Sequence, residues 1–239
     1  MPVSDTAEKN SSASGAAATI SQLFSTPLVR VTYPYADEVS APLAARILER
    51  DQGGPGPVKD FGYKTETSGE LTRWAGPEAQ RLSRWVCAVA GRFVESLTRM
   101  SLAEAYARAS RREAGTTDTD TDVGEGGRPA VRVGVTRSWA SVYRAGDRHE
   151  AHFHPNTALS AVYYVTAPGP CELDLLDPRP NVDYFDAGIS LAGDSHRVRL
   201  SCAPGELLVF PGWLKHAVPS FRGDAVRVSV AWNLNYTSG

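Results

Sequence analysis

Histidine is concentrated in one short stretch of the chain. Three of the five histidines fall between His149 and His154, in HEAHFH. If this stretch is a strand, side-chain alternation places His152 and His154 on one face with Glu150, and His149 on the other. Two imidazoles on one strand face are typical of a divalent metal site. The spacing therefore predicts His152 and His154 as metal ligands and His149 as a bystander.

A third ligand has to come from another part of the chain. His216 follows a buried strand and a Pro-Gly turn in LVFPGWLKHAVP. In a two-sheet barrel a later strand of this kind can lie beside the earlier one, which would bring His216 to the same mouth. We therefore expect a metal on His152, His154 and His216. The remaining histidine, His196, does not share this spacing and is expected at the surface or behind the ligands.

Composition limits the class of partner. The net charge of -2 and the pI near 6.2 give no basic excess for nucleic acid or an anionic membrane. No apolar run approaches the roughly 18 residues of a membrane-spanning helix. The three cysteines are far apart and form no CxxC pair, which predicts a reduced, cytoplasmic protein. A small-molecule substrate is expected, and a homodimer is compatible with the sequence.

The region before the histidines is predicted to be mainly helical. Residues 1–20 are polar and rich in Ser and Ala, so they are predicted to be a disordered tail. Residues 23–33 alternate like a strand, and residues 41–51 are predicted to be a short helix that GGPGP stops. The strongest helix is predicted over residues 76–100, with apolar side chains three and four apart. Residues 101–113 either extend it or form a second helix.

An acidic, Gly-rich segment, GTTDTDTDVGEGGRP, separates these helices from a β-rich remainder. We expect residues 21–110 to support the fold, residues 111–130 to be a flexible loop, and residues 131–239 to be the core. The core region consists of short β-rich runs divided by Gly, Pro and Asp. The predicted class is mainly β with N-terminal helices, arranged as a double-stranded β-helix, which is a jelly-roll or cupin-like barrel.

Cupins share the His-x-His spacing and supply one alternative function. Gly146, His152 and His154 match their first motif, but Ala158 and Leu159 stand where that motif has Glu. Their second motif is met only in part. The residues so far leave open a cupin-type metal dioxygenase or isomerase that needs no 2-oxoglutarate, or a non-catalytic metal-binding barrel.

A basic residue lies at a characteristic distance after the last predicted ligand. Arg227 follows His216 by eleven residues in RVSVAWN, and Ser229 shares its strand face. A guanidinium fork is well matched to a carboxylate. The Arg-x-Ser pair therefore resembles the clamp that holds 2-oxoglutarate in Fe(II)/2-oxoglutarate oxygenases, and it favours that class over the cupins.

The wider resemblance is to a bacterial family of 2OG-Fe(II) oxygenases, and it runs from about Leu23 to Asn233. The shared elements are LFSTP, Trp139, HFHPNTALSAVYYV, the DPR turn, LVFPGWLKH and RVSVAWN. Prolyl-hydroxylase-like relatives have Tyr-x-x-Gly, five residues and His-x-Asp, and here His154 replaces the Asp. Because members of the resembled family carry HxHP, a His at this position is in keeping with the resemblance.

The resemblance implies an activity. Fe(II) would lie on the three histidines and 2-oxoglutarate on Arg227, Ser229 and Tyr143, with dioxygen as the second co-substrate. The expected reaction is hydroxylation of an unactivated C–H bond in a small amino-acid-like or peptide-like metabolite. Glu150 could replace the missing carboxylate, either as a ligand or behind the ligands. Five side chains are candidates for contact with the substrate: Trp139, Tyr164, Arg179, Trp213 and Trp232.

Overall fold

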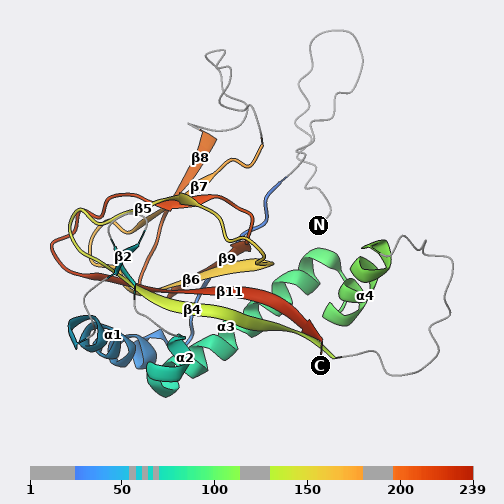
Figure 1. Cartoon of the computed structure of the whole chain (residues 1–239), viewed down its shortest axis with the longest axis horizontal. Coiled ribbons are helices and arrows are strands. Elements are labelled where there is room, and N and C mark those ends of the chain that lie inside the picture. The colour runs from blue at the N-terminus through green and yellow to red at the C-terminus, as the bar shows by residue number, and fades with distance from the viewer. Residues whose placement is uncertain are drawn as a thin grey trace, which may run out of the picture.

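The computed structural model describes residues 25–53, 58–60, 64–66, 70–113, 130–179 and 196–238. Two β-sheets lie one above the other, and the helices lie below the larger sheet (Figure 1). The predicted tail, residues 1–20, lies outside the described residues, and so does most of the predicted loop, residues 111–130. The division into supporting and core regions remains a prediction.

Consecutive core strands lie in opposite sheets, except that the strands Glu172–Leu176 and Arg197–Ser201 both belong to the smaller sheet. The larger sheet has the order β1-β9-β6-β11-β4-β3-β2 and the smaller one β5-β10-β7-β8. Antiparallel strands that are divided between two facing sheets in this order form a double-stranded β-helix. The predicted fold is therefore confirmed. Within the described residues the two sheets do not close into one hydrogen-bonded barrel. The core strands are β4 (Val131–Tyr143), β5 (His149–His152), β6 (Leu159–Thr166), β7 (Glu172–Leu176), β8 (Arg197–Ser201), β9 (Glu206–Pro211), β10 (His216–Val218) and β11 (Arg227–Ser238).

Within the described residues, the N-terminal region supplies three strands and four helices. The first predicted helix begins earlier than expected, because Val39 is buried on the same face as Leu43 and Ile47, four and eight residues on. The helix over Gly76–Thr98 confirms the strong amphipathic pattern, and the helix over Leu102–Glu113 confirms the second-helix alternative. No described helix is long and apolar enough to cross a membrane. The elements are β1 (Val29–Thr32), α1 (Ala36–Gly53), β2 (Val58–Asp60), β3 (Lys64–Glu66), α2 (Leu71–Trp74), α3 (Gly76–Thr98) and α4 (Leu102–Glu113).

The larger sheet has two differently used faces. Its lower face packs on the helices, where Val230 and Trp232 of β11 meet Leu82 and Val86 of α3 in one apolar cluster. The upper face turns Arg227, Ser229 and Ala231 towards the smaller sheet, since β-strand side chains alternate. Trp232 therefore belongs to the core under the sheet, and its prediction as a substrate contact is wrong.

The buried indole of Trp232 also makes a polar contact. Its Nε1–H donates to Ser83 Oγ at 2.9 Å, and the side chain is 0% exposed. We expect Trp232→Phe to lower the free energy of unfolding by about 1–3 kcal/mol, because it removes a buried hydrogen bond and leaves a cavity. Urea denaturation followed by circular dichroism measures this change. Trp213→Phe is the control, because Trp213 is 52% exposed and should shift stability by less than about 0.5 kcal/mol. Equal losses in the two variants would contradict this assignment.

Candidate metal centre

A pocket lies between the two sheets and is lined from both. β4, β6 and β11 form its floor, and β5 and β10 supply histidines from the other side. The histidines stand at one end and Arg227 lies at the other end of the pocket-lining residues of β11. The pocket therefore joins the two groups that the sequence predicts for metal and carboxylate binding.

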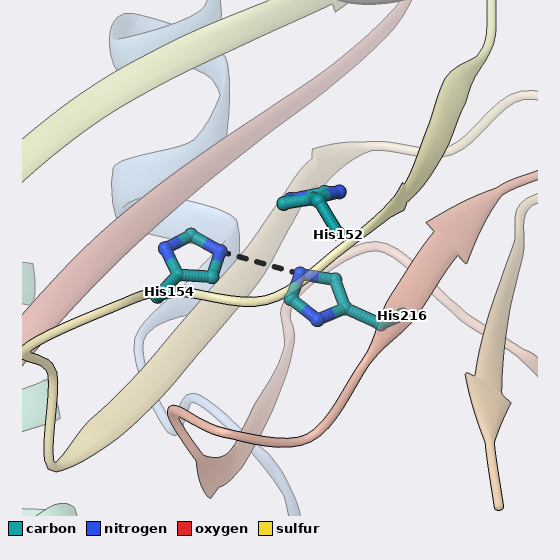
Figure 2. A group of neighbouring side chains, drawn as sticks. All are labelled: His152, His154 and His216. Carbon is teal, nitrogen blue, oxygen red and sulfur yellow. Dashed lines mark hydrogen bonds between the residues drawn. The ribbon is translucent and has the colours of Figure 1, made fainter. Parts of the chain in front are cut away.

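Three histidines converge at the outer end of this pocket. His152 ends β5, His216 begins β10, and the two residues are directly opposite each other in the antiparallel pair. His154 lies beyond the end of β5, where its backbone N–H donates to the Gly212 carbonyl at 2.9 Å. One ring nitrogen from each lies within 4.8 Å of the others, and Figure 2 shows the three side chains next to one another, with the rings of His154 and His216 turned toward each other. The predicted set is thus brought together, although His154 is held by a loop instead of the predicted strand.

The hydrogen bonds of the three rings fix which nitrogen faces inward. Each Nδ1 meets an oxygen that only accepts, so in the neutral ring the proton is on Nδ1 and Nε2 keeps its lone pair. Nε2 of His154 and Nε2 of His216 are 3.3 Å apart, and two lone pairs at this distance need a shared cation. The donor set therefore fits a metal ion. The three acceptors are the Glu150 carbonyl at 2.8 Å from His152, Asn233 Oδ1 at 2.6 Å from His154, and the Leu214 carbonyl at 2.9 Å from His216.

The residues next to the ligands differ from the prediction. His149 does not point away, because its ring centroid lies 3.8 Å from that of His152. The cause is an irregularity in the β5–β10 pairing, where three steps along β5 match two along β10 and alternation is lost. Glu150 pairs instead with Arg148 at 2.7 Å, and its side chain is 66% exposed. Its carboxylate therefore points to solvent and does not supply the missing ligand.

The other end of the pocket holds a buried cation. Arg227 is 2% exposed, and its guanidinium carbon lies 4.7 Å from the Tyr143 ring centroid. One of its terminal nitrogens donates to the Glu172 carbonyl at 3.3 Å, while its Nε has no hydrogen-bond partner in the part of the chain that the structure describes. The Glu172 carboxylate turns to Arg199 at 3.5 Å. Among the described residues, no carboxylate forms an ion pair with Arg227.

The groups around this guanidinium are neutral. Burial raises the pKa of the Tyr164 phenol well above its ordinary range, and burial raises the pKa of the Cys171 thiol to about 11. A buried cation without an anion is costly, so the protein gains if a ligand brings a carboxylate. Ser160 Oγ also lines the pocket and has no hydrogen-bond partner among the described residues. The pocket end therefore fits the far carboxylate of a dicarboxylic acid such as 2-oxoglutarate.

The pocket sorts the predicted site residues into two groups. It is lined by the three histidines, by all three predicted 2-oxoglutarate contacts, and by Trp139 and Tyr164 among the substrate candidates. The other substrate candidates lie elsewhere. Arg179 is exposed and pairs with Asp177, and Trp213 is not among the lining residues. His196 lies at the start of β8, where its carbonyl accepts from the backbone N–H of Asp177 at 2.8 Å.

A comparison with protein families finds a match that covers the strands around the pocket. Residues 137–233 match the family model described as "Putative 2OG-Fe(II) oxygenase". The match begins within β4 and ends within β11, so it contains the strands that form the pocket. No curated protein matches the chain significantly.

Solved structures with a similar fold include two proteins of nogalamycin biosynthesis. AviO1 from Streptomyces viridochromogenes Tue57 has a TM-score of 0.51 at 12% identity, and 87% of this chain and 89% of that chain are covered. The non-heme alpha ketoglutarate dependent epimerase SnoN from nogalamycin biosynthesis also has a TM-score of 0.51 at 12% identity, with 89% and 78% covered. For the carbocyclase SnoK of the same biosynthesis the TM-score is 0.51 at 12% identity, with 87% and 79% covered. Because the identities are this low, these matches show that the fold is shared and nothing more.

Proposed function

We propose that this protein, an Fe(II)- and 2-oxoglutarate-dependent oxygenase by its match over residues 137–233, hydroxylates an unactivated C–H bond of a small amino-acid-like or peptide-like molecule. The enzyme class and its use of Fe(II), 2-oxoglutarate and dioxygen follow from that match. The observation that carries the assignment of the site is the buried Arg227, which no carboxylate of the described residues neutralises. A cupin-type enzyme that binds no dicarboxylate would leave this buried guanidinium without a neutralising anion, which is costly.

The metal would be held by the Nε2 atoms of His152, His154 and His216. When bound, Fe(II) together with 2-oxoglutarate and dioxygen supplies the oxidising power, and 2-oxoglutarate leaves as succinate and carbon dioxide. The protein's part is to orient these ligands. Three Nδ1–H hydrogen bonds fix the rings with their lone pairs inward, so little reorganisation is needed on metal binding.

The opposite end of the pocket would position 2-oxoglutarate. The Arg227 guanidinium would bind its far carboxylate, and Ser229 shares the pocket-facing side of β11 two residues further on. The Tyr143 ring lies under the guanidinium and keeps it from turning away. Because these groups are almost fully buried, water is kept from the bound carboxylate and the electrostatic attraction is strong.

Anaerobic addition of Fe(II) and 2-oxoglutarate tests this proposal. We expect a visible metal-to-ligand charge-transfer band, and then succinate release when oxygen is admitted. With substrate present, mass spectrometry should find a product one oxygen atom heavier. Absence of both the band and succinate would overturn the proposed site. A product with no added oxygen would leave the enzyme class in place and reject hydroxylation.

The cellular setting is proposed on separate grounds. Cys87, Cys171 and Cys202 are all free, and Cys171 and Cys202 are buried. Free buried thiols are ordinary in a reducing compartment, which supports a cytoplasmic location. A small molecule remains the proposed substrate, since the sequence carries no basic excess for nucleic acid.

A further inference from the structure

A second arginine, Arg137, stands at the outer end of the pocket-facing side of β4. Trp139, Ser141 and Tyr143 of this strand all line the pocket. Arg137 is two residues before Trp139, so its side chain leaves the strand on the same face. The intervening Ser138 faces the other way, where its Oγ accepts from the backbone N–H of Leu71. Although exposed, Arg137 therefore belongs to the face of the sheet that carries the site.

The strand pairing places Arg137 at the metal end of the pocket. Its direct partner on β11 is Asn233, and Asn233 is the residue that hydrogen-bonds to His154. Side chains directly opposite each other on one face begin about 4.5–5.5 Å apart. The partner of Arg227 on β4 is Tyr143, six residues further along. The two arginines therefore stand at opposite ends of the pocket, about 20 Å apart along the strands at 3.3 Å per residue.

Ring contacts link Arg137 to the ligands. Its guanidinium carbon lies 5.1 Å from the Trp139 ring centroid. The Trp139 ring is stacked on His154, with centroids 5.6 Å apart and planes 19° from parallel. A tryptophan contact of this kind restrains an arginine without neutralising it. Arg137 forms no ion pair with any residue that the structure describes. Its charge is thus held beside the metal ligands and is available to an anion.

We infer that Arg137 binds an anionic group of the substrate, a carboxylate in the amino-acid-like class, while Trp139 packs against the substrate's carbon skeleton. This inference rests on the proposed function, because it assumes that the substrate enters at the metal end while Arg227 holds 2-oxoglutarate. A guanidinium binds a carboxylate through two parallel N–H donors, so it fixes orientation as well as affinity. The C–H bond to be oxidised then lies a few bonds from that carboxylate.

A matched-pair screen tests the inference on the wild-type holoenzyme. The probes are N-acetyl amino acids and dipeptides, each compared with the same compound as its C-terminal amide. We expect one or more of the acids to stimulate succinate release above the level without substrate, and the matching amides to stimulate much less. Amides that stimulate as well as their acids, or a panel in which no acid stimulates, would overturn the inference.

Arginine variants then locate the effect. For a stimulating acid, Arg137→Gln should raise KM about 10- to 100-fold, the loss expected for a charged hydrogen bond, and Arg137→Lys should recover part of it. Arg132→Gln is the matched control, since Arg132 is exposed on the same strand, pairs with Thr237 beyond Asn233 and is not among the residues that line the pocket. An unchanged KM in Arg137→Gln, or an equal rise in Arg132→Gln, would also reject the inference.

Failure of the proposed function has a different signature. The charge-transfer band forms without substrate, so it reports on the metal and 2-oxoglutarate sites alone. If the wild-type band is absent, the proposed site fails. If the band is present in wild type and in Arg137→Gln while the acid and amide are used equally, only the role of Arg137 fails.

Discussion

Arg227→Ala is expected to weaken 2-oxoglutarate binding by about 30-fold or more while the metal still binds. The guanidinium is 2% exposed and stands at the far end of the pocket from the histidines. Removing one partner of a buried, hydrogen-bonded charge pair typically costs about 2–5 kcal/mol, which corresponds to a loss of about 30-fold to several-thousand-fold. The three histidine rings have their own hydrogen bonds, none of which involves Arg227, so their geometry should persist.

Two anaerobic titrations measure this effect. The first follows Fe(II) binding alone, and the second follows the charge-transfer band as 2-oxoglutarate is added. Arg227→Lys should retain part of the affinity, because a lysine keeps the charge but loses the paired donors. Arg148→Ala is the control, since Arg148 pairs with the exposed Glu150 outside the pocket. Unchanged 2-oxoglutarate affinity in Arg227→Ala would contradict the role of Arg227 and favour a metal-binding barrel that needs no 2-oxoglutarate.

The parts of the site that follow from chain order could be predicted from the sequence. A jelly roll sets β10 beside β5, so a His near the end of one strand and a His near the start of the other meet by topology. Arg227 and Ser229 could be predicted because strict alternation holds on the central strand β11. The first prediction depends only on the order of the strands, and the second depends on the alternation of side chains along β11.

The predictions that were wrong depend on an irregular strand pairing or on which face of the sheet the helices cover. His149 joins the pocket because the β5–β10 register slips, and no residue type in HEAHFH signals a bulge. Trp232 lies on β11 with Arg227, and assigning its face required knowing that α3 covers the lower side. Asn233 is the last residue of the RVSVAWN motif. Its role could not be assigned, because His154 is 79 residues away in sequence and meets it only through the fold.

His154→Ala is expected to reduce Fe(II) affinity by about 100-fold or more, whereas Glu150→Gln should leave it unchanged. His154 contributes one of three converging Nε2 atoms, while the Glu150 carboxylate points to solvent with Arg148. Loss of one of three protein ligands costs more than loss of an outer hydrogen bond, which itself typically costs 10- to 100-fold in metal affinity. Anaerobic Fe(II) titration by calorimetry compares the two variants directly. The opposite pattern would make Glu150 the ligand.

Variants of Asn233 extend the Fe(II) titration, because Asn233 holds His154 in place beyond the end of β5. Its Oδ1 accepts from His154 Nδ1 at 2.6 Å, which fixes the ring and its tautomer. Asn233→Ala should therefore lower Fe(II) affinity by about 10- to 100-fold. Asn233→Asp keeps the acceptor and adds a negative charge behind His154, so it should retain or raise the affinity. If both variants weaken iron binding equally, the residue supports the loop and not the ring. If only Asn233→Ala does, a neutral imidazole fixed by an amide replaces the carboxylate that sites of this kind usually carry.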